Sequence, residues 1–304
     1  MVWNFEDTYV DLPKIFYSNV NPEVVNSEKL IVFNKDLANE IDINFDEFNE
    51  KEICDILLGK LSNKKFFSQA YAGHQFGHFT ILGDGRALLL GEHVSNNNQR
   101  FDIQLKGSGK TPYSRNGDGK AVLGPMIREY LVSEAMHYLG IPSTRALAVI
   151  STGENVLREK TEPGAILIRV AKSHIRVGTF QFGSLLKKRE EFENLISYTI
   201  NRLYPELNNE NNKYIKFFEK VCELQMNLII DWMRVGFVHG VMNTDNMSLS
   251  GETIDYGPCA FLENYNPKTV FSSIDRAGRY SFENQPKIGL WNLARLAETF
   301  LYLI

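Results

Sequence analysis

The chain has 304 residues, a length that suggests about two domains or one large domain with two lobes. Hydrophobic residues make up 43% and charged residues 23%, which excludes collagen-like, low-complexity and disordered chains. Lys and Arg number 33 against 37 Asp and Glu, and the net charge is −4. This balance gives no overall attraction to nucleic acid or to an anionic membrane, so we predict neither as a partner. Any bound anion must be held by a local basic cluster.

The cysteines and the first residues bear on the compartment. Cys54, Cys222 and Cys259 are odd in number and far apart, which argues against a disulfide framework or a thiolate zinc site. Glu6 and Asp7 stand where a targeting peptide would be basic, and no run of roughly 18 apolar residues follows. We therefore predict a cytoplasmic protein.

The order of the predicted elements divides the chain into three parts. Residues 1–60 mix apolar and acidic patches, with a loose helical period between Asp42 and Leu58, and we predict an extension packed on the main body. Strand patterns dominate residues 61–184, and helix patterns dominate residues 185–304. The sequence therefore predicts an α+β fold with a β-rich N-lobe followed by a helical C-lobe.

Strand patterns begin at Phe79. Apolar runs over residues 79–82 and 87–92 flank Gly83-Asp84-Gly85-Arg86, which predicts a β-hairpin with its turn at these four residues. We expect a strand over 101–105 that runs into Lys106, a helix over 125–139, and strands over 147–151 and 165–170. Later elements are helices over 189–203, 214–234 and 291–304, a short strand at 237–238 and a hairpin-like segment over 247–254.

Lys106 and Glu129 match a known pair of positions: a lysine that ends the third strand and a glutamate in the following helix. In protein kinases a Gly-rich hairpin covers the phosphates, this lysine reaches them, and the helix glutamate holds the lysine. The alternative is that both residues are solvated surface charges, as most such residues are. The second half of the chain favours the kinase-like interpretation.

The segment from His239 to Asn246 fits the kinase catalytic loop H-R-D-x-x-x-x-N at its first and last residues. Asp255-Tyr256-Gly257, which begins nine residues after Asn246, is similar to the Asp-Phe-Gly triplet whose aspartate holds magnesium. We therefore predict Asn246 and Asp255 as metal ligands.

The same loop departs from the kinase pattern at one position. A kinase has an aspartate two residues after the histidine to accept the substrate proton, whereas this chain has Val241. Asp245 is the nearby carboxylate that could act as the base or as a further metal contact. The alternative is that Asp245 only orders the loop through local hydrogen bonds.

Basic residues concentrate in the β-rich part. The loop after Lys106 is also rich in glycine, which allows the backbone to approach a polyphosphate closely. We predict a phosphate-binding role for this loop. The concentrated basic residues suit phosphate oxygens, with a surface position as the alternative for several of them: Arg86, Lys106, Lys110, Arg115, Lys120, Arg169 and Arg176.

Four long strings carry a resemblance to a known family. They are YAGHQFGHF at 71–79, QLKGSGKTPYSR at 104–115, IREYL at 127–131 and GVMNTDNM at 240–247. Together they resemble the selenoprotein O family, and the similarity extends from about Gln69 to the last residue. This resemblance implies a pseudokinase that binds ATP in a reversed orientation and transfers AMP, rather than phosphate, to Ser, Thr or Tyr hydroxyls of proteins.

The resemblance also implies a role for individual residues. Asp245 matches the family's catalytic base, and Asn246 and Asp255 match its ligands for Mg²⁺, with Mn²⁺ as an alternative metal. The positions that match its nucleotide contacts are Gly83, Gly85, Arg86, Lys106, Asp118, Gly119, Arg169, Arg176 and Asp255. In the reversed orientation, the β- and γ-phosphates would lie in the β-rich lobe, where the basic residues can neutralise them.

Three questions remain open at this level. A non-catalytic nucleotide-binding scaffold and a phosphotransferase that uses Asp245 are alternatives to the adenylyltransferase. His74 and His78 have the spacing of a zinc-binding helix, but Gly73 and Gly77 argue against a helix, which leaves a structural role or a place near the nucleotide. The helix predicted over 291–304 has no polar cap or glycine after it, and the family continues further, so we predict a truncated chain whose helical lobe is incomplete.

Overall fold

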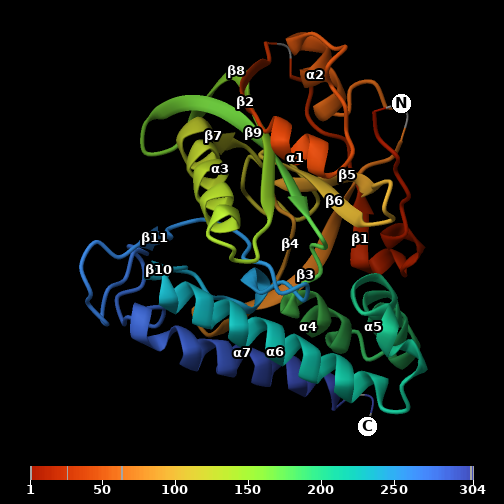
Figure 1. Ribbon diagram of the computed structural model, residues 1–304, viewed down its shortest axis with the longest axis vertical. Helices are drawn as coiled ribbons and strands as arrows, with labels where there is room; N and C mark the ends of the chain where they lie inside the picture. Colours follow the sequence, from red (N-terminus) through yellow and green to blue (C-terminus); the bar gives the residue numbers. More distant parts are fainter. Residues whose placement is uncertain (1, 26, 63, 302, 304) are drawn as a thin grey trace. The chain divides into compact units, whose positions relative to one another are not determined.

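The computed structural model describes residues 2–25, 27–62, 64–301 and 303. They form two compact units that are described separately (Figure 1). Unit 1 comprises Met1–Ala70, Gly83–Ala135 and Thr144–Lys172, and unit 2 comprises Tyr71–Leu82, Met136–Ser143 and Ser173–Ile304. Unit 1 is rich in β-strands and unit 2 in helices, which confirms the α+β class predicted from the sequence.

An antiparallel sheet forms the centre of unit 1. Its strands follow the order β1-β3-β5-β6-β9-β8-β2, with β4 paired to β3 and β7 paired to β9. The bounds are β1 Tyr17–Asn19, β2 Lys29–Phe33, β3 Phe67–Gln75, β4 His78–Gly83, β5 Ala87–Val94, β6 Arg100–Lys106, β7 Ala121–Val122, β8 Arg145–Leu157 and β9 Thr161–Ala171. The three strands predicted over 101–105, 147–151 and 165–170 are therefore confirmed as β6, β8 and β9.

Alternation along β6 gives the sheet one apolar and one polar face. Ile103 and Leu105 are fully buried in a hydrophobic core with Ile168 of β9. Gln104 and Lys106 point to the other face, because successive side chains of a strand alternate. Helix α3, Leu123–Tyr138, contributes Met126 to an apolar cluster that includes Leu167, and it corresponds to the helix predicted over 125–139.

Residues 1–60 are an integral part of unit 1 rather than an extension packed on it. They supply β1 and β2, the two ends of the strand order, and the helices α1, Lys35–Glu40, and α2, Glu50–Leu57. Leu37 and Leu57 of these helices are buried in the same core as β6. The N-terminal segment therefore completes the sheet and its core.

The predicted hairpin around residues 83–86 is wrong in its pairing. β4 pairs with β3, and β5 pairs with β3 and β6. The tight turn lies between β3 and β4, where Phe76 (φ 51°) and Gly77 (φ 89°) adopt left-handed conformations. Asp84 instead lies between the end of β4 and the start of β5, two strands that both pair with β3. Its backbone N–H donates to the Gln69 carbonyl of β3 at 2.9 Å.

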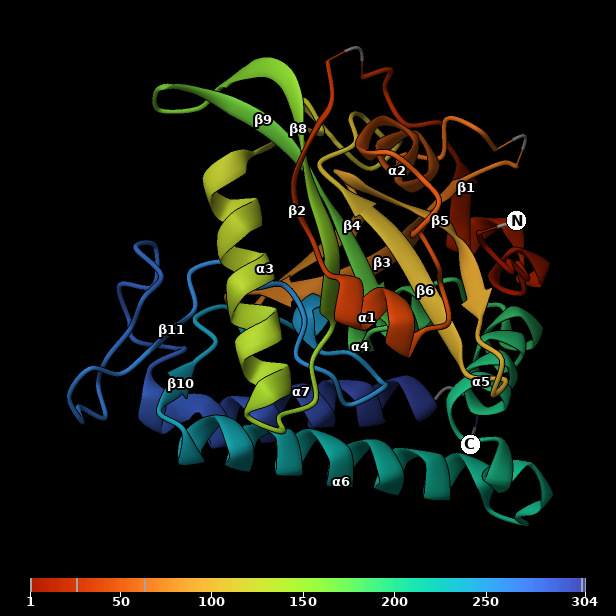
Figure 2. The ribbon, with the colours of Figure 1, turned by 45° about the horizontal axis from the view of Figure 1, so that its top comes forward.

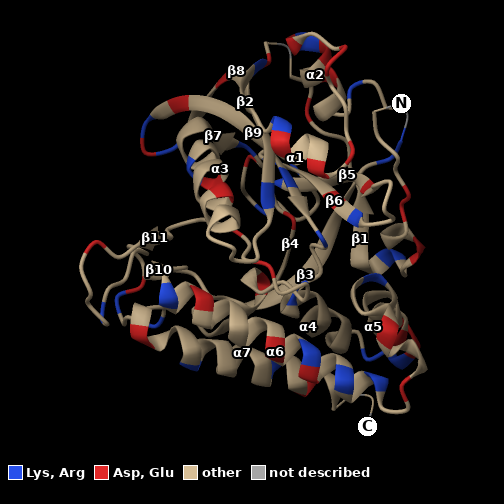
Figure 3. Cartoon of the chain, viewed as in Figure 1, with Lys and Arg blue, Asp and Glu red and all other residues tan. Residues whose placement is uncertain are grey.

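Unit 2 is built on helices α4, Val177–Leu185, α5, Arg189–Leu203, α6, Lys213–Arg234, and α7, Gln285–Phe300. Helices α6 and α7 lie side by side (Figures 1 and 2), with Gly289 of α7 leaving room for Ile229 of α6. Both basic and acidic residues lie along α6 (Figure 3), as in the pair Lys220–Glu223 at 2.9 Å. The helices predicted over 189–203 and 214–234 are confirmed, the last helix begins at Gln285, and α4 was not predicted.

Short strands and bridges complete unit 2. The strand predicted at 237–238 is β10, Phe237–Val238, which pairs with β11, Ala260–Phe261. The segment 247–254 is not a hairpin: Ser248 bridges to Arg176, and Thr253 bridges to Ser143. In the part of the chain that the structure describes, no helix has both the length and the apolar character needed to span a membrane.

The two units differ from the lobes predicted by sequence. The β-rich unit ends at Lys172 rather than at residue 184, because β9 ends at Ala171 and the next segment bonds within unit 2. There, Leu249 N–H donates to the Ile175 carbonyl and Val177 N–H to the Met247 carbonyl, both at 2.9 Å. Residues 71–82, with the β3–β4 turn, also belong to unit 2.

Candidate active site

In unit 1, Lys106 and Glu129 form a buried ion pair. Lys106 is the last residue of β6 and Glu129 lies in α3, and their Nζ and Oε2 atoms are 2.6 Å apart. Only 6% of Lys106 and 2% of Glu129 is exposed, so neither is a solvated surface charge. A strand lysine held by a glutamate of the following helix is the arrangement of protein kinases, so the predicted pairing of Lys106 with Glu129 is confirmed.

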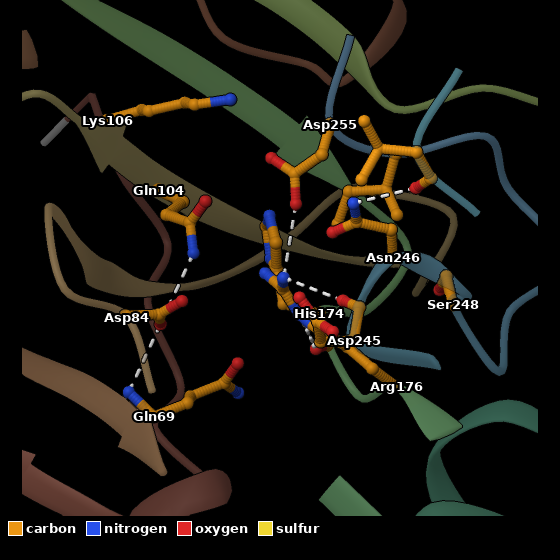
Figure 4. A network of polar contacts seen from close by, with 12 residues as sticks. Gln69, Asp84, Gln104, Lys106, His174, Arg176, Asp245, Asn246, Ser248 and Asp255 are labelled. Atoms are coloured by element: carbon orange, nitrogen blue, oxygen red, sulfur yellow. Dashed lines mark hydrogen bonds and ion pairs between the residues drawn. The ribbon is translucent and has the colours of Figure 1, made fainter. Parts of the chain in front are cut away.

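A second cation shares the same carboxylate. Arg169 of β9 donates to Glu129 Oε1 from Nε at 3.0 Å and from Nη2 at 2.5 Å. Its Nη1 donates to Gln104 Oε1 at 3.1 Å, and Gln104 Nε2 donates to Asp84 Oδ2 at 3.4 Å (Figure 4). Gln104 and Arg169 are direct cross-strand partners, which explains why both side chains lie on the face that carries Lys106.

The trio brings two cationic groups to one place. Lys106 and Arg169 both bind the carboxylate of Glu129, and all three side chains are buried. Ammonium and guanidinium groups suit phosphate oxygens. The phosphate-binding role of Lys106 and Arg169 stays a prediction.

The glycines near this trio serve loop packing. A Cβ on Gly83 would lie 2.4 Å from the Tyr113 ring, and one on Gly85 would lie 2.9 Å from the Tyr113 carbonyl oxygen. Gly119 has φ +70°, and a Cβ there would lie 2.0 Å from the Gly109 carbonyl oxygen. Gly83, Gly85 and Gly119 were all predicted to contact the nucleotide. In the structure, their lack of a side chain lets residues 107–120 fold tightly over the start of β5.

The charged residues predicted to contact nucleotide near this loop have different surroundings. Arg86 is exposed. Asp118 accepts from both Nη atoms of Arg158, at 2.7 and 3.0 Å, and this guanidinium lowers the pKa of Asp118 to about 2. Lys120 binds Glu154 at 2.6 Å.

In unit 2, the loop of residues 239–246 is held by its own histidine. His239 Nδ1 accepts from Val241 N–H at 3.3 Å, and its Nε2 bonds the Ile254 carbonyl at 2.8 Å. Burial lowers the pKa of His239, so the ring is neutral and can accept at one nitrogen while donating at the other. Asn246 Nδ2 donates to the Val241 carbonyl at 3.0 Å and closes the loop.

Asp245 has the environment of a general base. It is 6% exposed, and burial raises the pKa of its carboxyl to about 6, partly offset by Arg176. Its Oδ2 lies 3.5 Å from Gln75 Nε2, and its buried Oδ1 has no hydrogen-bond partner among the described residues. A carboxyl that titrates near neutral pH with one oxygen unused can accept a proton from a substrate.

Arg176 links Asp245 to Asp255. Its Nη1 donates to the Asp245 carbonyl at 3.1 Å and to Asp255 Oδ2 at 3.2 Å (Figure 4). The guanidinium also lies 4.6 Å from the centre of the Tyr71 ring and is 2% exposed. Asp255 has φ +64°, a conformation that is rare outside glycine and that is typical of functional positions. The structure thus brings together in unit 2 the predicted residues Arg176, Asp245, Asn246 and Asp255.

These residues also fit the predicted metal. Mg²⁺ prefers oxygen ligands and is usually held by one or two carboxylates together with substrate phosphates. Asp255 and Asn246 supply oxygens of this kind, and the unpartnered Oδ1 of Asp245 lies beside Asn246 in the chain. No group of three or more His, Cys, Asp or Glu side chains suited to a metal occurs among the described residues, so a cage made by the protein alone is not present there.

The sequence did not identify the contact between the end of β3 and the 239–246 loop. His74 N–H donates to Thr244 Oγ1 at 2.7 Å, and Phe76 N–H donates to Asn243 Oδ1 at 3.1 Å. A Cβ on Gly73 would lie 2.3 Å from Asp245 Oδ1, so only glycine fits there. Residues 71–79 are one of the four strings that carried the family resemblance, and that string was the available signal. The backbone of His74 thus takes part in this contact.

Comparison with known proteins identifies the family. The model of the family described as "Protein adenylyltransferase SelO" matches residues 1–304. The chain belongs to the SelO family. This confirms the family predicted from the four sequence strings.

The relatives in the SelO family are called protein nucleotidyltransferase YdiU. The chain is 58% identical over 304 residues to the protein of Pelagibacter ubique (strain HTCC1062), 57% over 304 residues to that of Brevibacillus brevis, and 58% over 307 residues to that of Clostridium perfringens (strain SM101). Each alignment covers 99% of this chain and 62–63% of the relative, so the chain spans less than two thirds of their length.

Among solved structures, a similarity is found to ROP2 from Toxoplasma gondii, described as a virulence factor with a protein-kinase fold and no enzymatic activity. The identity is 9%, the TM-score is 0.38, and the match covers 86% of this chain and 76% of that chain.

Proposed function

We propose that the chain is a protein adenylyltransferase, which transfers AMP from ATP to Ser, Thr or Tyr hydroxyls of proteins and requires Mg²⁺ or Mn²⁺. Membership of the SelO family and the name of its curated relatives support nucleotidyl transfer as the reaction class. The observation that carries the proposal is Asp245, a buried carboxyl with a pKa of about 6 and an unpartnered Oδ1. Asp245 thus offers a base in a loop that has Val241 where a kinase has its catalytic aspartate.

The residues of the chain suggest how the reaction is divided. Asp245 accepts the proton of the acceptor hydroxyl, and the hydroxyl oxygen forms a bond to the α-phosphorus of ATP. The bond between that phosphorus and the bridging oxygen breaks, and pyrophosphate leaves with its electron pair. Lys106 and Arg169, held by Glu129, neutralise phosphate charge, which lowers the barrier to this departure.

The metal and the reversed nucleotide are part of the same proposal. Asn246 and Asp255 would hold the ion, and a bound Mg²⁺ would supply charge neutralisation on the phosphates. Reversal of ATP is supported by the buried cations Lys106 and Arg169 in unit 1, which suit the β- and γ-phosphates, and by the position of Asp245 four residues after the kinase base position.

Labelled ATP tests the proposal. The chain is incubated with Mg²⁺, a protein acceptor mixture and ATP labelled at either the α- or the γ-phosphate. Label from the α-phosphate on protein, with no label from the γ-phosphate, is the expected result. Transfer of γ-label would instead indicate a phosphotransferase that uses Asp245, and transfer of neither label would indicate a nucleotide-binding scaffold.

A further inference from the structure

The first turns of α4 pack directly on the residues around Asp245. A Cβ on Gly178 would lie 2.0 Å from the Ala72 carbonyl oxygen and 3.2 Å from Asp245 Cα, so the helix backbone touches both β3 and the loop. Arg176, which precedes the helix, donates to the Asp245 carbonyl. Helix α4 is thus the platform on which the 239–246 loop rests.

Gln181 of α4 forms a closed ring of hydrogen bonds with this loop. Thr244 Oγ1 donates to Gln181 Oε1 at 2.6 Å and accepts from His74 N–H at 2.7 Å. The ring closes where Gln181 Nε2 donates to His74 Nδ1 at 2.9 Å. Both ends of the amide are used, so its orientation is fixed by its partners.

The ring lies where a lost bond is costly. Thr244 is fully buried and Gln181 is 5% exposed, so a polar atom left without its partner has no water to replace it. Burial lowers the pKa of His74, so its imidazole stays neutral and its Nδ1 can accept a hydrogen bond. Thr244 is the residue before Asp245, so the ring fixes the peptide that carries the carboxyl.

We propose that Gln181 is a positioning residue for the reaction: through Thr244 it holds Asp245 in place, and through His74 it ties the end of β3 to the same loop. This inference rests on the proposed function. Loss of the Gln181 hydrogen bonds should lower kcat rather than weaken ATP binding, because Gln181, Thr244 and His74 are not among the residues predicted to contact the nucleotide. Loss of an outer partner of this kind typically costs about 10–100-fold in activity.

The test measures α-label transfer and ATP binding for four single variants and one double variant of the full chain. Gln181→Met removes both amide groups at similar size, Thr244→Val removes the hydroxyl, and Thr244→Ser keeps it. Thr199→Val is the matched control, because its buried hydroxyl donates to the Leu195 carbonyl of its own helix at 2.7 Å. The Gln181→Met/Thr244→Val double variant completes a double-mutant cycle.

Gln181→Met and Thr244→Val are expected to lower kcat by about 10–100-fold with the Kd for ATP changed less than about 2-fold, whereas Thr244→Ser and Thr199→Val stay near wild type. In the Thr244→Val background, Gln181→Met should have little further effect. Equal kcat for Gln181→Met and the Thr199→Val control, or losses that multiply in the double variant, would overturn the positioning role while leaving the function intact. A wild-type chain that transfers no α-label would refute the proposed function and, with it, the reaction that Gln181 serves.

Discussion

Replacing Glu129 with Gln tests how the buried cations of unit 1 are held. The carboxylate accepts from Lys106 Nζ at 2.6 Å and from Arg169 at 3.0 and 2.5 Å, and it is 2% exposed. The neutral amide has nearly the same shape but removes the negative charge that both buried cations bind. Breaking a buried pair in this way costs about 3–5 kcal/mol.

The expected change is large enough to measure by thermal unfolding. For a unit of about 150–250 residues, 1 kcal/mol corresponds to roughly 2–4 °C, so Glu129→Gln should lower Tm by about 6–20 °C. Asp46→Asn is the control, because its pair with Lys35 has the same 2.6 Å distance but side chains that are 59% and 65% exposed, and solvent screening leaves such pairs little effect on stability. Combining Glu129→Gln with Lys106→Met should recover part of the loss, since one of the two cations that bind this carboxylate is removed.

If Glu129→Gln and Asp46→Asn lowered Tm by the same few degrees, the Glu129 carboxylate would not stabilise unit 1 through its buried ion pairs. If Lys106→Met made Glu129→Gln worse, the lysine would stabilise unit 1 by packing rather than through Glu129.

Three further predictions concern unit 2 and the N-terminal part of unit 1. Asp245→Asn should lower kcat for AMP transfer by at least about 100-fold with ATP affinity retained in a calorimetric titration; loss of binding as well would make Asp245 a ligand residue rather than the base. Gly73→Ala should displace the Asp245 carboxylate and lower kcat by about 10-fold or more, whereas Gly124→Ala, which has nothing within 4 Å, should not; equal rates for the two would contradict this contact. Burial lowers the pKa of His93, whose Nε2 bonds the Ile41 carbonyl at 2.8 Å. The neutral imidazole therefore stabilises the folded chain above pH 6.5, which is about the pKa of His93 in the unfolded chain, and this stabilisation is lost as the pH falls below that pKa. His93→Gln should therefore reduce the fall in unfolding free energy between pH 6.5 and 5.5 by up to about 1.4 kcal/mol per pH unit, measured by denaturant titration, and an unchanged slope would assign the pH dependence to other groups.

Local patterns predicted the elements whose ends and partners lie close in the chain. The helix periods over 189–203 and 214–234 correspond to α5 and α6, and Lys106 and Glu129 were paired because a lysine at the end of a strand and a glutamate in the next helix follow the kinase order. The loop from His239 to Asn246 also has its anchor inside its own sequence, since His239 and Asn246 both bond Val241. Motif spacing is sufficient in these cases because the interacting groups are fixed by one or two adjacent elements.

Pairing across the sheet could not be predicted in the same way. The glycines at 83 and 85 suggested a hairpin turn, but the turn lies at Phe76 and Gly77, because β4 and β5 both pair with β3. Strand register depends on which faces are buried against the rest of the sheet rather than on turn residues alone. The same holds for Gln104, which bonds Arg169 only because β6 and β9 are neighbours in register.

The sequence by itself determined the α+β class, the family, and the residue types of the candidate site, because these depend on periodicity and on long motif strings. Only the tertiary structure decided the environment of Asp245. Gly73 lies close to its carboxylate, Arg176 donates a hydrogen bond to its carbonyl, and Thr244 beside it is hydrogen-bonded to Gln181. These groups are distant in the chain, and only the packing of β3 and α4 on the loop brings them together. That packing removes water from the carboxyl and raises its pKa to about 6, so the chemistry of this aspartate comes from the fold rather than from its motif.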